Sequence, residues 1–324
     1  MTAKKQFRQF DQSIRTWGLC GLGAIVLAAL PTFARAEVLE SQKIVDPKTV
    51  GSKMVEVTRD GFRVTLSSTR VADGGVQLVT VAVPPGMVGV PSGRFEGADV
   101  LFFSVSATEF QAVFGIPFGT KSGATEFRVE FGNGNRKRIF AVPFQIADGN
   151  YASEALKVDP RHVNPDPKSL KRILREQKEI GALYRAHTFK KHWQGPFLLP
   201  IESPVTSPFG TRRVFNGEMR SFHQGLDLKA AVGTPVRSSG NGAIVMAKDL
   251  FFTGNTVFVD HGYGMITFYA HLSRMNVRKG QKVRAGEQVG LAGMTGRASG
   301  PHLHWGVVIN RAKVNPMELL QVVK

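Results

Sequence analysis

Residues 300–309, Gly-Pro-His-Leu-His-Trp-Gly-Val-Val-Ile, form the most informative segment of the chain. Side chains alternate between the two faces of a β-strand, so His302 and His304 share one face while Leu303 and Trp305 lie on the other. The apolar run that follows is typical of a strand packed on a core. Two imidazoles on one face are either a metal-binding or catalytic pair or two surface histidines held by hydrogen bonds.

A second segment, His223-Gln-Gly-Leu-Asp227, offers donors that would complete a metal site. In an extended strand, residues 223, 225 and 227 share one face, and Gly225 has no side chain to obstruct an ion between the imidazole and the carboxylate. Two histidines and one aspartate form a three-ligand zinc set of the catalytic type, which leaves a fourth position for water. The residues alone leave open whether His302 or His304 is the second histidine ligand.

The other histidines also need an interpretation. His271 ends a predicted strand, which is a common place for a catalytic side chain, and the alternative is a histidine that only caps the strand. His261 lies in Asp260-His261-Gly262, which resembles a turn, and we interpret it as structural. Three isolated histidines in the predicted linker and helix are interpreted as surface residues: His162, His187 and His192.

The chain is predicted to be all-β with two domains. Over residues 37–150, apolar and polar residues alternate in short runs, and Gly132-Asn133-Gly134-Asn135 separates two of these runs as a hairpin turn would. We expect an antiparallel, β-sandwich-like accessory domain there and find no cluster of chemically useful residues in it. Strands and glycine turns return over residues 197–324, where the clearest strands are Thr256–Val259, Met265–Tyr269, Gln288–Leu291 and Leu303–Ile309.

Residues 151–196 are predicted to connect these two domains. Three prolines between residues 158 and 167 are typical of a linker. From Lys168 to about Tyr184, apolar residues lie near one face of a predicted helix. Eight lysines and arginines between Lys168 and Lys191 outnumber two glutamates, so this stretch is either a solvated helix face or a contact for an anionic polymer of the cell envelope.

The composition indicates a folded, basic protein. With 324 residues, of which 42% are hydrophobic, the chain has enough apolar mass for packed cores, and a disordered or fibrous protein is excluded. A single cysteine excludes an intrachain disulfide and a cysteine-based zinc site. The net charge of +17 favours an anionic partner such as nucleic acid, a membrane surface or an anionic polymer.

Residues 1–36 have the pattern of a secretory signal peptide. Basic residues precede the uncharged, mostly apolar run Trp17–Leu30, and Ala34-Arg35-Ala36 follows as a cleavage site. The run is short for a membrane span, which needs about 20 residues, so no integral span is expected after cleavage; an uncleaved anchor is the alternative. Export favours the periplasm, or a secreted or envelope-associated location, and argues against a nucleic-acid partner.

Eight short motifs follow one another in the last third of the chain. They are Ser207-Pro208-Phe209-Gly210, Arg212-Arg213, His223-Gln-Gly-Leu-Asp227, Gly233-Thr234-Pro235-Val236, Asp260-His261-Gly262, Tyr269-Ala270-His271-Leu272, Gly293-Met294-Thr295-Gly296 and Gly300-Pro-His-Leu-His-Trp305. In this order and spacing, residues 201–318 resemble the lysostaphin/LytM-type zinc endopeptidases of bacterial cell walls. The ordered set is far more specific than any one of its motifs.

The resemblance implies a role for each site residue. By similarity, His223, Asp227 and His304 bind one Zn²⁺, and His271 and His302 flank a zinc-activated water that hydrolyses a peptide bond. It also implies a small antiparallel β domain with the site in an open groove and peptidoglycan as the substrate. A Gram-negative periplasm would make the D-alanyl–diaminopimelate cross-link the target; a Gram-positive bridge, or a secreted enzyme that acts on other cells, is the alternative.

Three other functions are compatible with parts of the sequence. A non-catalytic regulator or activator that binds peptidoglycan would keep the fold, although the complete set of five site residues argues against it. The repeats Val277-Arg-Lys-Gly280 and Val283-Arg-Ala-Gly286 resemble hairpins of biotinyl or lipoyl carriers, but they lack a lysine at a tight turn between strands. The glycines at 290, 293, 296 and 300 lack phosphate-loop spacing, and we interpret them as a flexible loop.

Overall fold

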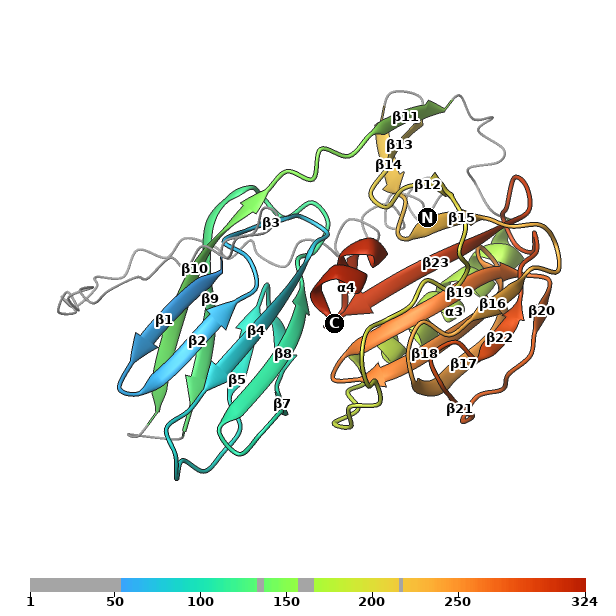
Figure 1. Cartoon of the computed structure of the whole chain (residues 1–324). Helices are drawn as coiled ribbons and strands as arrows, with labels where there is room; N and C mark the ends of the chain where they lie inside the picture. Colours follow the sequence, from blue (N-terminus) through green and yellow to red (C-terminus); the bar gives the residue numbers. More distant parts are fainter. Residues whose placement is uncertain (1–53, 133–136, 157–165, 216–217) are drawn as a thin grey trace. The chain divides into compact units, whose positions relative to one another are not determined.

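The computed structural model describes residues 54–132, 137–156, 166–215 and 218–324, all within one compact unit of the chain (Figure 1). Strands dominate, and the described residues include two helices, α3 (Pro167–Arg185) and α4 (Pro316–Val322). The predicted all-β class is therefore confirmed. No helix within these ranges is long and apolar enough to cross a membrane. The predicted signal peptide, residues 1–36, lies outside the described residues.

Two five-stranded sheets in the N-terminal part enclose one apolar core between them. Strand β10 shows how the sequence builds it, because Phe140, Val142, Phe144 and Ile146 are buried and the residues between them are exposed. The pairs are antiparallel except for β3 with β10, which is parallel. In spatial order, the strands are β1 (Val55–Arg59), β2 (Phe62–Leu66), β4 (Val76–Ala82), β8 (Glu109–Gly115) and β7 (Phe103–Ser104) in one sheet, and β3 (Arg70–Ala72), β10 (Arg138–Ala147), β9 (Gly123–Phe131), β5 (Ser92–Phe95) and β6 (Ala98–Leu101) in the other.

Helix α3 begins at a well-formed cap. The Asp166 side chain accepts hydrogen bonds from the backbone N–H groups of Lys168 and Ser169, and Pro167 occupies the first turn, where its missing N–H costs nothing. The helix confirms the one predicted from Lys168 to about Tyr184. It ends at Arg185.

The C-terminal part is built on a large, antiparallel, eight-stranded sheet. Strand β23 lies at its centre between β15 and β19. In spatial order the strands are β12 (Val205–Ser207), β15 (Leu226–Lys229), β23 (His302–Ile309), β19 (Met265–Leu272), β18 (Gly254–Gly262), β17 (Gly242–Leu250) and β21 (Lys282–Val283), with β24 (Ala312–Val314) paired to β23.

Two smaller sheets flank the large one. The first consists of β16 (Pro235–Arg237), β22 (Gln288–Leu291) and β20 (Arg274–Met275). The second joins the linker to the C-terminal part, because β11 (Ser153–Leu156) pairs in parallel with β13 (Arg212–Phe215), which forms a hairpin with β14 (Glu218–Phe222).

The two faces of the large sheet pack against different groups. Leu303, Trp305 and Tyr269 belong to the main core on one face. On the other face, α3 places Ile180, Leu183 and Tyr184 against a smaller cluster, and Figure 1 shows α3 running along this sheet. The members of the cluster are Leu250, Phe258, Ile266, Phe268 and Val308.

The main core also takes side chains from the N-terminal sheets, namely Val76, Phe103 and Val113. Beside it, the Glu318 carboxylate on α4 accepts a hydrogen bond of 3.0 Å from the backbone N–H of Val76. Burial raises the pKa of Glu318 above its ordinary value. The N-terminal sheets therefore contribute directly to the packing of the C-terminal part.

Candidate metal centre

Strand β23 brings two histidines to one face of the large sheet, as alternation predicts. Leu303 and Trp305 are fully buried in the main core. His304 points the other way, and its ring centroid lies 5.6 Å from that of Phe268 in the cluster beneath α3. The candidate site therefore lies on the face of the sheet that α3 partly covers.

Three side chains converge on this face. Asp227 pairs with His304 in the register of β15 and β23, and Asp227 Oδ1 lies 2.8 Å from His304 Nδ1. His223 Nε2 lies 3.0 Å from each of these atoms. The three atoms form a nearly equilateral triangle.

His223 reaches the triangle by a different route from the one predicted. The expectation that residues 223–227 form one strand is wrong, because β14 ends at Phe222 and β15 begins at Leu226. Hydrogen bonds hold the His223 backbone at the base of the β13–β14 hairpin, where its N–H donates to the Thr211 carbonyl at 2.9 Å. The chain must turn before β15, so strand alternation does not apply.

A backbone carbonyl orients the His223 ring from the side away from the triangle. Its Nδ1 lies 2.8 Å from the Pro208 carbonyl oxygen. A carbonyl can only accept a hydrogen bond, so the neutral ring carries its proton on Nδ1 and presents the lone pair of Nε2 to the triangle.

The donor triangle fits a zinc ion. One carboxylate oxygen and two imidazole nitrogens form a ligand set of catalytic zinc sites, which keep a fourth position open. Ligand atoms around a tetrahedral zinc with bonds of about 2.1 Å lie roughly 3.4 Å apart, so the donors need to separate by only about half an ångström. Within the described ranges, His223, Asp227 and His304 are the only such group of three.

Gly225 makes room for a ligand, whereas the sequence suggested that it makes room for the ion. A Cβ atom on Gly225 would lie 2.7 Å from Cε1 of His304 and 2.6 Å from the carbonyl oxygen of Trp305. Both distances are far shorter than a normal contact. The absence of a side chain at this position lets the His304 ring lie over the backbone.

Burial and hydrogen bonding set the protonation of the donors. Burial opposes the ionised form of Asp227, but hydrogen bonds with His223 and His304 outweigh this effect and hold the pKa of Asp227 well below its ordinary value. Burial lowers the pKa of His304 to about 4. At neutral pH, a carboxylate therefore lies beside a neutral His304 imidazole, and these are the forms that bind metal.

His271 reaches the same face through a β-bulge. Alternation would point it with Tyr269 into the main core, but β19 shifts register against β18 between Asn255 and Val257, and His271 has a φ of +59°. A bulge re-aims a side chain, and the left-handed backbone costs about 1–3 kcal/mol that the surrounding structure must offset. The ring centroids of His271 and His302 consequently lie 4.8 Å apart.

His271 and His302 are held in the same way. Nδ1 of His271 lies 2.8 Å from the Thr295 carbonyl oxygen, and Nδ1 of His302 lies 2.8 Å from that of Gly300. In the neutral form each ring therefore donates through Nδ1 and presents Nε2; His302 Nε2 is 3.8 Å from Asp227 Oδ1. Burial lowers the pKa of His271 below its ordinary value, which favours its neutral form.

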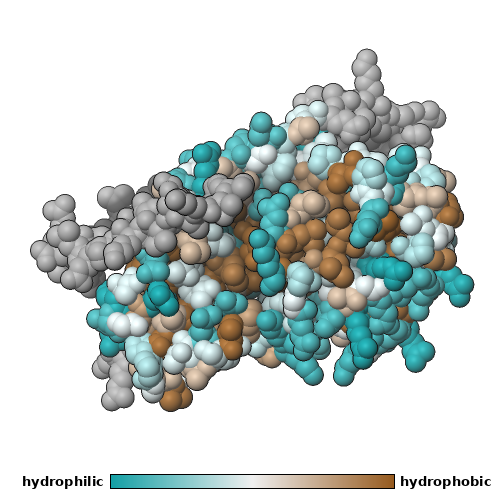
Figure 2. Space-filling model, in the orientation of Figure 1, coloured by the Kyte–Doolittle hydropathy of each residue, from teal (hydrophilic) through white to brown (hydrophobic). Residues whose placement is uncertain are grey.

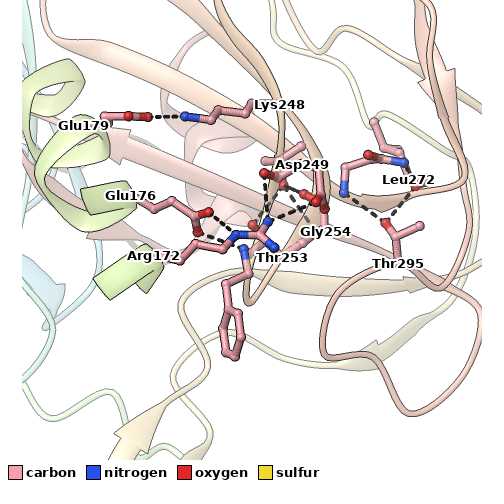
Figure 3. Close-up of polar contacts among 12 residues, drawn as sticks. Arg172, Glu176, Glu179, Lys248, Asp249, Thr253, Gly254, Leu272 and Thr295 are labelled. Carbon is pink, nitrogen blue, oxygen red and sulfur yellow. Dashed lines mark hydrogen bonds and ion pairs between the residues drawn. The ribbon is translucent and has the colours of Figure 1, made fainter. Parts of the chain in front are cut away.

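Thr295 connects the loop beside His271 to the sheet. Its Oγ1 donates to the Leu272 carbonyl at 2.8 Å and accepts from the Asn255 N–H at 2.9 Å (Figure 3). Sequence reasoning gave no positioning role to Thr295 or Pro208, because both hold a histidine through a backbone carbonyl. Their presence in two of the eight motifs was the available signal.

The remaining histidines lie apart from this cluster. His261 is fully buried, with Nδ1 2.8 Å from the Asn241 carbonyl and Nε2 2.8 Å from Thr267 Oγ1, so it is structural as interpreted. The predicted turn at residues 260–262 is wrong, because these residues end strand β18. His187 is exposed and His192 half-buried. His162 lies outside the described residues.

Comparisons place the chain among known peptidases. The model of peptidase family M23 matches residues 221–316, which contain all five site residues. A crystal structure assigned to peptidase M23 from Pseudomonas aeruginosa is 33% identical, with a TM-score of 0.59, and the similarity covers 78% of this chain and 95% of that chain. That similarity extends well beyond the segment that carries the site.

Two curated relatives are similar over the C-terminal part alone. Peptidoglycan DD-endopeptidase ShyA of Vibrio cholerae serotype O1 is 41% identical over 122 residues, which are 37% of this chain and 28% of ShyA. DD-carboxypeptidase/endopeptidase Mpg of Neisseria meningitidis serogroup B is 42% identical over 119 residues, which are 37% of this chain and 27% of Mpg. The chain thus spans less than a third of the length of either relative.

Proposed function

The chain belongs to peptidase family M23, which confirms the resemblance of its motifs, and we propose that it is a zinc-dependent endopeptidase that cuts peptide cross-links of bacterial peptidoglycan. The observation that carries this proposal is the triangle of donors from His223, Asp227 and His304, with two further imidazoles beside it. The names of the curated relatives support the choice of substrate.

The metal ligands in this proposal are His223 Nε2, Asp227 Oδ1 and His304 Nδ1. A zinc ion bound there would polarise the scissile carbonyl and make a water molecule acidic enough to attack near neutral pH. The Pro208 carbonyl fixes the tautomer of His223, and the register of β15 and β23 fixes Asp227 against His304. The backbone thus holds the three donors together on one face of the sheet.

His271 and His302 are the proposed proton-handling residues. Each presents Nε2 on the face that holds the donor triangle. A neutral Nε2 accepts a proton from the attacking water and returns it to the departing amine nitrogen. A protonated Nε2 donates to the scissile carbonyl oxygen as negative charge develops there.

The proposal also includes a location and a bond. Residues 1–36 would direct export, and the periplasm is the compartment that their signal pattern favours. In that compartment the substrate would be the D-alanyl–diaminopimelate cross-link. The description of ShyA as a DD-endopeptidase supports a bond of this class.

Digestion of purified cross-linked sacculi by the full chain tests the proposal. We expect cross-linked dimers to fall to monomers, with glycan strands intact, as read by chromatography and mass spectrometry. A zinc chelator should stop the reaction and added zinc should restore it. His304→Ala should lose both zinc and activity, whereas His302→Ala should keep zinc and lose about 10²–10⁴-fold in rate.

The exposed His187 supplies a matched control, because His187→Ala removes an imidazole without touching the cluster. This variant should digest sacculi at the native rate. Cleavage of glycan strands would overturn the proposed bond. Bound zinc without cleavage of any peptidoglycan would favour the non-catalytic regulator over the enzyme.

A further inference from the structure

Helix α3 docks on the C-terminal part through both of its acidic side chains. Its acidic side chains face the C-terminal part, where Glu176 accepts hydrogen bonds from the Phe251 N–H at 2.8 Å and from Arg172 Nε at 2.6 Å. Glu179 forms an ion pair of 2.6 Å with Lys248. Figure 3 shows these contacts between the helix and the sheet. The helix therefore uses all of its negative charge to dock.

The exposed side of α3 carries a row of cations, which we call the basic rail. Their spacing places them within roughly 100° of the helix circumference and spreads them over about 26 Å of its length. No acidic side chain in the described part of the chain forms an ion pair with them. The members of the basic rail are all exposed: Lys168, Lys171, Arg175, Lys178 and Arg185.

The basic rail lies on the same side of the large sheet as the metal centre. The apolar face of α3 packs on the cluster that contains Phe268, and Phe268 is in turn a neighbour of His304. The outward face of α3 is therefore on the same side of the large sheet as the histidines.

The helix lacks the means to insert into a lipid surface. An interfacial helix needs a free apolar face, but Ile180, Leu183 and Tyr184 are engaged by the sheet. Leu174 is the one large apolar side chain that α3 exposes. A hydrated polymer with repeated negative charges needs no apolar contact and matches a row of cations.

We propose that the basic rail binds the carboxylates of uncut peptides on peptidoglycan and thereby holds the polymer across the metal centre. This inference rests on the proposed function for the identity of the polymer. A single exposed ion pair contributes little, but several carboxylates on one polymer bind together, so their effects multiply. Binding of this kind weakens steeply as salt screens the charges.

The test is sedimentation of the full chain with sacculi in chelator, so that binding is measured without digestion. The rail variant combines Lys168→Gln, Lys171→Gln, Arg175→Gln, Lys178→Gln and Arg185→Gln, and glutamine preserves helix propensity. The control variant removes the same charge from exposed positions around β21, over which Figure 2 shows a hydrophilic surface: Arg274→Gln, Arg278→Gln, Lys279→Gln, Lys282→Gln and Arg284→Gln.

We expect the rail variant to bind sacculi about tenfold more weakly than the native chain at low salt, and the control variant to stay within about twofold. With zinc present, kcat/KM of the rail variant on sacculi should fall by the same factor, because KM rises while kcat is unchanged. It should cleave a soluble cross-linked dimer, which is too short to extend from the metal centre along the rail, at the native rate.

Three results would overturn the inference. The first is native sacculus binding by the rail variant, and the second is an equal loss of sacculus binding in the rail and control variants. The third is a rail variant that loses binding only to vesicles of anionic phospholipid, which would assign the rail to a membrane surface. Failure of the proposed function gives a different result. If no peptidoglycan is cleaved but the rail variant alone loses sacculus binding, the binding role of the rail is supported and the proposed peptidase activity is not.

Discussion

At the residue scale, the position of His304 depends on Gly225. A Cβ atom there would lie 2.7 Å from the His304 ring and 2.6 Å from a backbone oxygen that cannot move aside. We therefore expect Gly225→Ala to displace the ring and to weaken zinc binding by about 10–100-fold, the range typical of altered support for a metal ligand. Competition with a chromophoric chelator measures this affinity.

Gly300 provides the matched control for that substitution. It lies beside the site, yet a Cβ atom on Gly300 would meet no heavy atom within 4 Å, and its carbonyl bond to His302 would remain. Gly300→Ala should bind zinc within about twofold of the native chain. Equal affinities for the two variants would show that the contact at Gly225 is relieved by small shifts.

The site residues differ in how far the sequence could place them. His302 and His304 were placed correctly because alternation along a regular strand is a local rule. Alternation does not place His223 or His271, because a hairpin turns the chain at one and a bulge re-aims the other, although His271 does lie at the end of its strand as predicted. Those two features depend on hydrogen bonds to segments far away in the sequence. The residue types suggested that the five residues form one site, and the family motifs indicated which histidine has which role.

At the element scale, the docking of α3 depends on Glu176. Its carboxylate is 6% exposed and bonds both the Phe251 N–H and the Arg172 guanidinium. Glu176→Ala leaves the Phe251 N–H without its partner, while Arg172 keeps its ion pair with Asp249, so we expect the free energy of unfolding to fall by about 1–3 kcal/mol. Denaturant titration of the full chain measures it.

Glu179 is the natural comparison on the same helix. Its ion pair with Lys248 joins side chains that are 37% and 39% exposed, so Glu179→Ala should cost less than about 1 kcal/mol. If Glu179→Ala destabilised the chain as much as Glu176→Ala, burial of the Glu176 carboxylate would not be what docks the helix.

Helices and strands were predictable where the pattern of apolar residues within the segment itself determines them. The predicted helix from Lys168 to about Tyr184 agrees with α3, and the predicted strand Gln288–Leu291 agrees with β22. The turn expected at residues 260–262 was wrong, because Gly262 continues the strand with a φ of +91° where a Cβ would strike the Lys190 carbonyl. The order in which strands pair was not predictable, because it depends on contacts between distant segments.

At the scale of the whole molecule, burial of neutral histidines makes stability depend on pH. Burial lowers the pKa of His261 to about 4, whereas in the unfolded chain its pKa returns to about 6.5. Between these values the unfolded state binds more protons, so the free energy of unfolding should fall as pH drops from about 6.5 to 4, by up to about 3 kcal/mol. Urea titration of the metal-free chain across this range measures the loss.

Other ionisable groups also contribute to the dependence of the free energy of unfolding on pH, so variants are needed to separate their contributions from that of His261. His304 adds a loss of the same sign on acidification, and the raised pKa of Glu318 adds a gain. His261→Gln should flatten the curve relative to that of the native chain. An unchanged slope in His261→Gln would mean that His261 is not the group that titrates.

Hydrogen bonds join the connecting segment between β10 and β11, residues 148–152, to the backbone of His223. The Arg212 N–H donates to the Ala152 carbonyl at 2.8 Å, just before β11, and the His223 N–H donates to the Thr211 carbonyl at 2.9 Å. Two hydrogen bonds, on either side of one peptide unit, thus link the connecting segment to the backbone of His223. A shift in the connecting segment would therefore reach the backbone of His223, and with it the metal site, through this ladder of hydrogen bonds.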